Sequence, residues 1–139
     1  MKFSDLLRIG SPERYFPVTN AVSAILAGDS RIQAALPPGE RQHLPVVMIA
    51  EYQFGMLGSR QRRKLERGFE LLESQSIVLP SDRRTADRYA EIRHALKLGG
   101  RPIPEIDLWI AALARQYSLA IVSRNANFDY VVGVRRLGW

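Results

Sequence analysis

Residues 105–123 read EIDLWIAALARQYSLAIVS, and this stretch decides the fold class. Its first part, Glu105–Tyr117, repeats apolar side chains at helical spacing and therefore predicts an amphipathic helix. The apolar stripe consists of Ile106, Trp109, Ile110 and Leu113. Its second part, Leu119–Ser123, is apolar up to its last residue, which is typical of a strand buried on both faces of a parallel sheet. A helix followed directly by a buried strand is the repeating unit of an α/β fold.

The same alternation continues toward both ends of the chain. Further strands are predicted at Arg14–Val18, Leu44–Ile49, Ser76–Pro80 and Val134–Leu137. Helices are predicted between them at Ala21–Ala27, Ile32–Leu36, Ala50–Leu57, Leu65–Leu72 and Ala86–Leu96. In the segment after residue 49, Ala50, Phe54 and Leu57 share one apolar helix face. Residues 14–139 are thus predicted to form one domain with a mainly parallel sheet, preceded by an N-terminal arm of residues 1–13.

The composition narrows the class of protein. A chain of 139 residues with 46% apolar side chains fits a single globular domain and excludes wholesale disorder. It contains no cysteine, which excludes disulfides, thiolate zinc sites, iron–sulfur clusters and cysteine nucleophiles. No stretch approaches the ~20 apolar residues that span a bilayer, and the N-terminus lacks a signal peptide. We therefore expect a soluble, cytoplasmic domain with no membrane partner.

The charge balance is basic. Twenty Lys and Arg residues against fourteen Asp and Glu residues give a formal net charge of +6. Such an excess favours a polyanionic partner, of which nucleic acid is the usual one. A solvated basic surface that serves solubility is an equally good interpretation.

Polar side chains follow several of the predicted strands. Because parallel α/β sheets bind ligands at the carboxyl ends of their strands, we expect these side chains to converge. They are Thr19 and Asn20 after the first strand, Glu51 after the second, Asp107 at the start of the 105–117 helix, and Asn125 and Asp129 after the fourth strand. The two histidines, His43 and His94, lie far apart in sequence and are expected at the surface rather than as a catalytic base.

Acids that converge in one pocket need a cation. Clustered carboxylates repel one another unless a positive charge neutralises them, and hard oxygen ligands favour Mg²⁺ or Mn²⁺ over zinc. Such an ion can polarise a phosphodiester and lower the pKa of an attacking water. The alternative interpretations are a solvent-facing helix charge for Glu51 and stabilisation of the helix dipole for Asp107.

Three segments of the chain together resemble a PIN domain of the VapC toxin type. They are the stretch from Gly100 to Phe128, the second acidic motif at Met48–Gly55, and the start of the first motif at Thr19–Ser23. The motifs occur in the right order, and the resemblance covers residues 14–139. It implies a three-layer α/β/α sandwich around a mainly parallel sheet of about five strands. It also implies a divalent-metal-dependent endoribonuclease, dimeric and held in check by a cognate antitoxin.

The resemblance assigns roles residue by residue. It implies that Glu51 and Asp107 are metal-binding acids for Mg²⁺ or Mn²⁺, with Asp129 as a third candidate ligand. Thr19 and Asn20 match the polar pair that follows the family's first acid, and Asn125 lies in the fourth motif. For contacts to RNA phosphates the candidates are Arg124 and the basic run 60–64, which includes Arg62 and Arg63. A solvated helix face is the alternative interpretation of that run.

Two positions depart from the family pattern. The family has an aspartate directly before the Thr-Asn pair, where this chain has Val18, and Asn125 and Asn127 stand where the fourth motif often supplies an acid. A valine cannot ligate a cation, and an asparagine offers one neutral oxygen. Two hypotheses follow. One is an active PIN ribonuclease with impaired cleavage. The other is a catalytically inactive PIN domain that binds RNA or a partner protein, such as an antitoxin helix laid beside the remaining acids.

Overall fold

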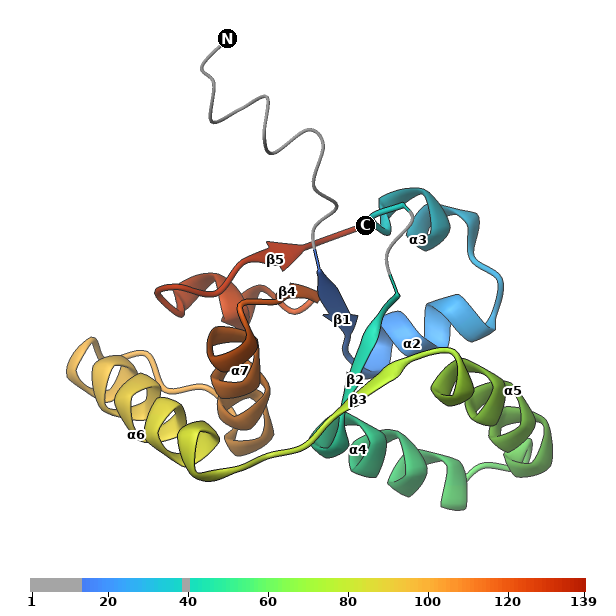
Figure 1. Cartoon of the computed structure of the whole chain (residues 1–139), viewed down its shortest axis with the longest axis horizontal. Coiled ribbons are helices and arrows are strands. Elements are labelled where there is room, and N and C mark those ends of the chain that lie inside the picture. Colours follow the sequence, from blue (N-terminus) through green and yellow to red (C-terminus); the bar gives the residue numbers. More distant parts are fainter. Residues whose placement is uncertain (1–13, 39–40) are drawn as a thin grey trace, which may run out of the picture.

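The protein is an α/β domain, seen here as a computed structural model that describes residues 14–38 and 41–139. The arm predicted for residues 1–13 lies outside the described residues. Along the chain the elements are β1 (Tyr15–Pro17), α2 (Thr19–Leu26), α3 (Ser30–Ala35), β2 (His43–Pro45), α4 (Val46–Leu57), α5 (Arg62–Ser74), β3 (Ile77–Leu79), α6 (Arg83–Leu98), α7 (Glu105–Tyr117), β4 (Ala120–Val122), the 3-10 helix η1 (Ala126–Tyr130) and β5 (Arg136–Leu137) (Figure 1).

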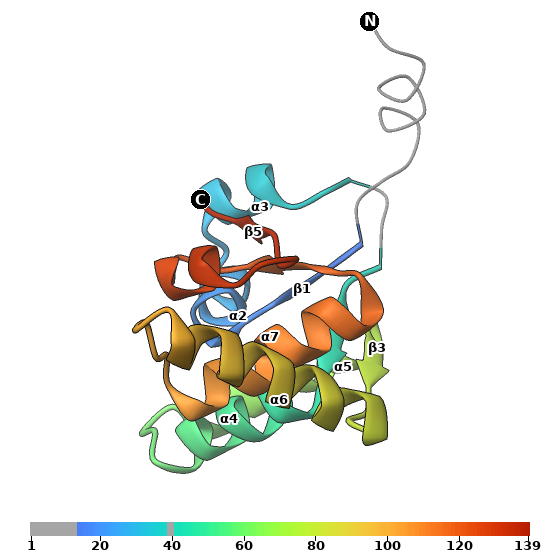
Figure 2. The same ribbon diagram turned by 90° about the vertical axis from the view of Figure 1, so that its left-hand side faces the viewer.

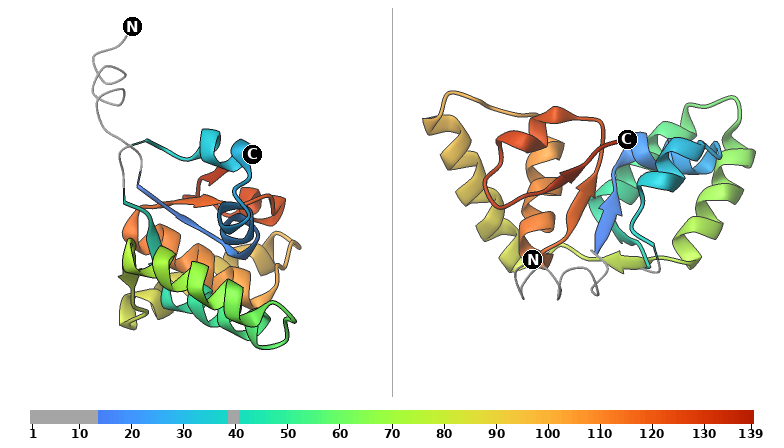
Figure 3. Two further views of the ribbon diagram at one scale, coloured as in Figure 1. Left: turned by 90° about the vertical axis from the view of Figure 1, so that its right-hand side faces the viewer. Right: turned by 90° about the horizontal axis from the view of Figure 1, so that it is seen from above.

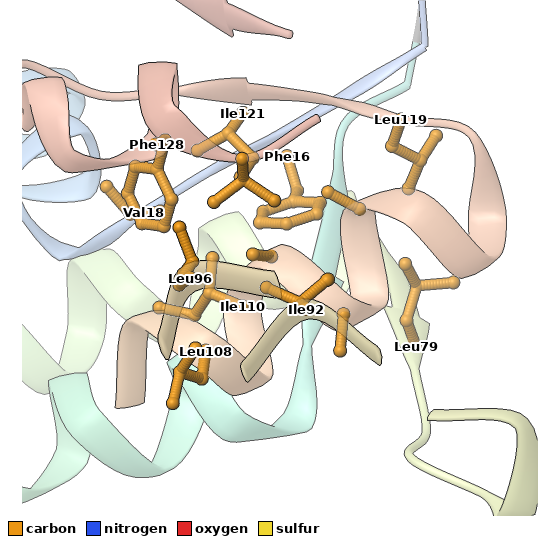
Figure 4. Close-up of a cluster of buried hydrophobic side chains, with 14 residues drawn as sticks. Phe16, Val18, Leu79, Ile92, Leu96, Leu108, Ile110, Leu119, Ile121 and Phe128 are labelled. Atoms are coloured by element: carbon orange, nitrogen blue, oxygen red, sulfur yellow. The ribbon is translucent and has the colours of Figure 1, made fainter. Parts of the chain in front are cut away.

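The strands form a parallel sheet between two layers of helices, as predicted. Parallel ladders join β1 to β4, β4 to β5, and β2 to β3. Figures 2 and 3 show α3 on one side of the strands and α4, α6 and α7 on the other. Successive residues of β1 confirm these two faces. Tyr15 packs in a cluster with Ala21 and Ile32 of α2 and α3, whereas Phe16 packs in a cluster with Ile110 of α7 (Figure 4).

Prolines explain why the sheet divides into a β1–β4–β5 part and a β2–β3 part. Val18 donates its backbone N–H to a carbonyl of β4, so its neighbour Pro17 faces the opposite side, toward β2. In the second part, Gln42 accepts an N–H from β3, and by the same alternation Pro45 faces β1. Proline has no N–H to donate, so both prolines remove a ladder bond from the same seam.

The predicted strand at Leu44–Ile49 is wrong beyond its first residues. The strand β2 ends at Pro45, and the helix α4 begins at Val46. A continuous apolar run has no period of its own and does not separate a strand from a buried helix. The buried side of α4 consists of Met48, Ile49, Tyr52 and Met56. The apolar face shared by Ala50, Phe54 and Leu57 lies on its exposed side.

The predictions for the 105–117 helix, the 119–123 strand and the two histidines were confirmed except for His43. The helix over Glu105–Tyr117 and the strand within Leu119–Ser123 are confirmed. His94 is exposed as expected, but His43 is buried within β2, because it belongs to the sheet rather than to the loop before it. Within the described part of the chain, no helix has the length and apolar character needed to cross a membrane.

Candidate functional site

A small cavity of about 130 Å³ opens where β1 and β4 end. It is lined by Val18, Thr19, Asn20, Glu51, Ile106, Asp107, Ile110, Ser123, Asn125 and Phe128. The side chains come from five different segments, which the parallel strands bring to one edge of the sheet. The structure therefore brings together Thr19, Asn20, Glu51, Asp107 and Asn125, the residues to which the sequence assigned the chemistry.

Asp107 is the buried acid of the cavity. It lies in the first turn of α7, and only 8% of its surface is exposed. Burial raises the pKa of the Asp107 carboxyl, while hydrogen bonds from Asn125 and Asn127 oppose that rise. Glu105, in the same first turn, is exposed and pairs with Arg93 instead. An acid that only stabilised the helix dipole could remain exposed, as Glu105 does. The burial of Asp107 therefore points to a further role for that acid.

The loop after β4 places Asn125 against Asp107. Ser123 is fully buried, and its Oγ accepts hydrogen bonds from the Asn125 backbone N–H at 2.9 Å and from Asn20 Nδ2 at 3.4 Å. Asn125 Nδ2 donates to Asp107 Oδ2 at 3.1 Å, while its Oδ1 accepts the backbone N–H of Asn127 at 3.0 Å. Asn125 thus presents a donor, not a ligand oxygen, to the acid. Ser123 belongs to the polar residues predicted to follow the fourth strand, but the sequence assigned it no role of its own.

Glu51 is the exposed acid of the cavity and the one charged residue of α4. It also lines a wider groove of about 500 Å³ together with Val47, Ala50, Phe54, Ser81, Ile106 and Trp109. Its carboxylate therefore stands at the junction of a polar cavity and an apolar groove.

Val18 occupies the position where the family pattern has an acid. It is the N-cap of α2 and has only 5% of its surface exposed. Its side chain belongs to the core cluster that includes Phe16, Ile110 and Phe128 (Figure 4), and it also lines the cavity. One wall of the cavity is therefore apolar where a carboxylate would be expected.

Asp129 lies outside the lining of the cavity. Both of its carboxylate oxygens accept hydrogen bonds from Arg136, each at 2.8 Å. These bonds hold the pKa of Asp129 below its usual value. The structure therefore gives this predicted third ligand a different partner, which the sequence could not indicate because Arg136 lies on another element.

The basic residues divide into two groups. Arg124 lies beside the site: its backbone N–H donates to Asn20 Oδ1 at 3.5 Å, and its guanidinium lies 4.5 Å from the centre of the Trp139 ring. Arg62 pairs with Glu66 at 2.6 Å, and Arg63 is exposed on α5. Within the same run, Gln61 and Lys64 line a cavity of about 420 Å³ whose lining also includes Thr19. Lys64 is the last residue of the basic run 60–64 predicted to contact phosphates.

Comparison with known proteins agrees with this geometry. The sequence profile of the PIN domain matches residues 15–134. The chain belongs to the PIN domain family. Ribonuclease VapC1 of Haemophilus influenzae (strain R2866) is 27% identical over 130 residues, which cover 90% of this chain and 97% of the relative. The PIN domain described here is thus placed among the VapC-like toxin ribonucleases.

Solved structures support the same placement of this PIN domain. VapBC-5 from Mycobacterium tuberculosis, a member of the VapBC family of toxin–antitoxin systems, has a TM-score of 0.75 and 27% identity, covering 92% of this chain and 100% of that chain. VapBC2 from Rickettsia felis, bound to a promoter DNA fragment, has a TM-score of 0.80 over 90% of this chain and 98% of that chain. At 20% identity the latter shows the fold alone.

The candidate site of this PIN domain offers a divalent cation few acidic ligands. Across residues 14–38 and 41–139, no three His, Asp or Glu side chains gather in a way that could hold a metal ion. Mg²⁺, however, is often bound through one or two carboxylates and completes its shell with water and substrate phosphate oxygens. Glu51 and Asp107 supply such a pair, with less negative charge than a larger acidic cluster would provide.

Proposed function

We propose that this protein is a Mg²⁺- or Mn²⁺-dependent endoribonuclease, the toxin of a toxin–antitoxin pair, with a slow cleavage step. The observation that carries the proposal is the convergence of Glu51, Asp107, Thr19, Asn20 and Asn125 on one cavity. The low rate follows from Val18 and Asn125, which replace charged ligands by an apolar and a neutral side chain. RNA is the proposed substrate, because the curated relative at 27% identity is a ribonuclease.

Each residue of the cavity has a defined task in this proposal. Glu51 and Asp107 would hold the cation, which when bound polarises the phosphodiester and lowers the pKa of a water. Asn125 orients the Asp107 carboxylate through its Nδ2 donor. Asn20 ties the start of α2 to Ser123 and to the Arg124 backbone. Arg124, whose backbone adjoins Asn20, and Lys64, which lines the neighbouring cavity together with Thr19, are the proposed contacts to RNA phosphates.

Metal removal tests this proposal. We expect cleavage of single-stranded or structured RNA with Mn²⁺ or Mg²⁺ and none with EDTA, because two acids alone cannot activate water without the cation. Gel analysis of RNA fragments measures cleavage, and calorimetric titration with Mn²⁺ measures binding to the protein alone. Cleavage that persists in EDTA would contradict the proposed chemistry.

The second candidate function is a catalytically inactive PIN domain that binds RNA or a partner protein. Val18 favours it, because that side chain fills part of the core rather than offering a ligand. The Asn125 amide also favours it, because an N–H donor on Asp107 compensates part of the charge that a cation would otherwise neutralise. An absence of Mn²⁺ binding in the calorimetric titration, together with retained RNA binding, would decide for this candidate.

An antitoxin is the proposed protein partner. Support comes from the solved relative of the VapBC family of toxin–antitoxin systems. The cavity between α2, α4 and α5 contains Thr19, which also lines the site, so a partner helix laid there would reach the neighbourhood of the acids. Its lining includes the apolar Leu26, Met56 and Leu65 and the cation Lys64. An amphipathic helix with an acidic residue would suit this mixture.

We also propose that a second copy of the chain covers the exposed face of α4. That face carries Val46, Ala50, Phe54 and Leu57, and 79% of the Phe54 surface is exposed. The groove beside it has room for an aromatic ring and is lined by Val47, Ile106 and Trp109. A protruding ring and an apolar groove on the same face suit a two-fold contact, in which each copy fills the groove of the other.

Substituting Phe54 tests the dimer. We expect Phe54→Asp to raise the dimer dissociation constant at least ~30-fold, because a lost interface anchor costs ~2 kcal/mol or more. Analytical ultracentrifugation over a range of concentrations measures the constant. Leu98→Asp is the matched control, since Leu98 is 76% exposed at the end of α6, away from this face. A monomeric wild type, or equal effects of both substitutions, would rule out the α4 interface.

A further inference from the structure

One guanidinium holds both ends of the loop that carries Asn125. Arg136, in β5, donates from Nη1 to the carbonyl oxygen of Ser123 at 3.1 Å. Its Nε and Nη2 donate to the two carboxylate oxygens of Asp129, each at 2.8 Å. Ser123 is the first residue after β4, and Asp129 lies in η1. Arg136 therefore closes the segment 123–129 into a loop, with Asn125 inside it.

The closed loop determines where the Asn125 amide points. The Asn125 backbone N–H is bound to Ser123 Oγ, and its side-chain Oδ1 is bound to the Asn127 backbone. With these two bonds made, the Nδ2 group is left to face Asp107, to which it donates at 3.1 Å. The hydrogen bond from Asn125 to the buried Asp107 thus depends on a loop whose two ends are bound by one guanidinium, that of Arg136.

Gly138 leaves room for this arrangement. A Cβ atom at position 138 would stand 3.0 Å from Arg136 Nη1 and 4.0 Å from the Ser123 carbonyl oxygen. A methyl group there would make the end of the Arg136 side chain shift by a few tenths of an ångström. The chain after β5 therefore approaches the loop closely because position 138 lacks a side chain.

We propose that Arg136 is a positioning residue, which fixes the Asn125 amide on Asp107 by binding Ser123 and Asp129 together. In this role Asp129 acts through Arg136 and not as a ligand of a cation. The proposal rests on the proposed function for its catalytic readout, whereas its structural readout is independent of that function. Arginine is required because only its planar group makes a two-point contact with a carboxylate and a third bond at the same time.

The test compares three variants with the wild type. Arg136→Met removes the group, and Arg136→Lys keeps the charge but cannot reach both ends of the loop. Arg31→Met is the matched control, because Arg31 makes a similar two-point pair with Asp29, at 3.2 and 2.9 Å, at the start of α3. NMR of the Asn125 side-chain amide reports its hydrogen bond, and calorimetric titration with Mn²⁺ measures the metal affinity of the two acids. Steady-state RNA cleavage over a range of RNA concentrations separates kcat from KM.

We expect both Arg136 variants to lose the slow exchange of the Asn125 amide protons and to bind Mn²⁺ ~10–100-fold more weakly, as for other groups that orient a ligand. The value of kcat should fall while KM changes little, and Arg31→Met should match the wild type. Unchanged amide exchange and Mn²⁺ affinity in Arg136→Met would overturn the proposal, as would equal losses in Arg31→Met.

Two further outcomes of this test can be told apart: a variant that does not fold, and a wild type without metal binding or cleavage. If Arg136→Met does not fold, Asp129→Leu decides, because it removes both acceptors that hold the guanidinium at the η1 end of the loop: the same loss of Asn125 protection is expected, and wild-type protection would overturn the proposal. If the wild type neither binds Mn²⁺ nor cleaves RNA, the proposed function fails. The Asn125 amide exchange then still supports or overturns the role of Arg136.

Discussion

Replacing Asp107 with asparagine is expected to abolish metal-dependent RNA cleavage, with a loss greater than ~100-fold. Groups that merely orient a metal ligand cost ~10–100-fold when they are removed, so the loss of a ligand itself should exceed that range. An asparagine at this position keeps the volume and can still accept the hydrogen bond from Asn125 through its Oδ1. Loss of activity would therefore report the missing charge rather than a rearranged cavity. The measurement is single-turnover cleavage at saturating Mn²⁺.

Glu105→Gln is the matched control for Asp107→Asn. Both acids lie in the first turn of α7 and act equally on the helix dipole, but Glu105 is exposed and pairs with Arg93. Its substitution should leave cleavage within a factor of ~2, since exposed ion pairs contribute little. Equal losses in the two variants would mean that the helix dipole, and not a cation site, explains the role of Asp107.

Val18→Asp is expected to produce the opposite effect, a gain of metal binding and of cleavage. An aspartate here would add a carboxylate to a wall of the cavity that also contains Glu51 and Asp107. We expect cleavage to rise at least ~10-fold and Mn²⁺ affinity to rise with it. Calorimetry and single-turnover cleavage measure the two changes.

The same substitution should make folding depend on the metal. Val18 is packed among Phe16, Ile110 and Phe128, and an uncompensated charge at such a place costs ~3–5 kcal/mol of unfolding free energy. Saturating Mn²⁺, at about 100 times its dissociation constant, should return ~2.7 kcal/mol. Thermal unfolding with EDTA and with Mn²⁺ measures both values. Val18→Asn is the neutral control, which Mn²⁺ should stabilise no more than it stabilises the wild type. A Val18→Asp protein that is destabilised and gains no response to Mn²⁺ would show that position 18 does not face the cation.

An element whose apolar residues repeat at helical spacing was predictable in both type and bounds, whereas a continuous apolar run left the type open: Leu119–Ser123 is a strand as predicted, but most of Leu44–Ile49 is not. The 105–117 helix follows from apolar residues at helical spacing, and its bounds are confirmed. The run 44–49 carries no such period. Pro45, the N-cap of α4, was a signal in the sequence for the helix start, whereas the packing of Met48 against the core is a tertiary contact. The exposed stripe of Ala50, Phe54 and Leu57 was equally hidden, because a helix that is apolar all round does not reveal which side faces the domain.

Most residues that line the candidate site were predictable from the sequence, but their side-chain pairings were not. The rule that ligand sites form at the ends of parallel strands is enough to bring Thr19, Glu51 and Asp107 to one cavity. It says nothing about which acids are already bound to arginines. Asp129, for example, forms an ion pair with Arg136 of β5, and the sequence does not show which side chains meet in this way.

The split in the sheet has a consequence for the pair of acids. Glu51 belongs to the helix that follows β2, whereas Asp107 and Asn125 flank β4, so the two carboxylates lie on different sides of the seam created by Pro17 and Pro45. Their separation is set by side-chain packing across that seam and not by a continuous ladder. Packed side chains slide more easily than a row of backbone hydrogen bonds stretches. We therefore expect the spacing of the two acids to adapt to a bound cation more readily than a spacing fixed by a continuous ladder would.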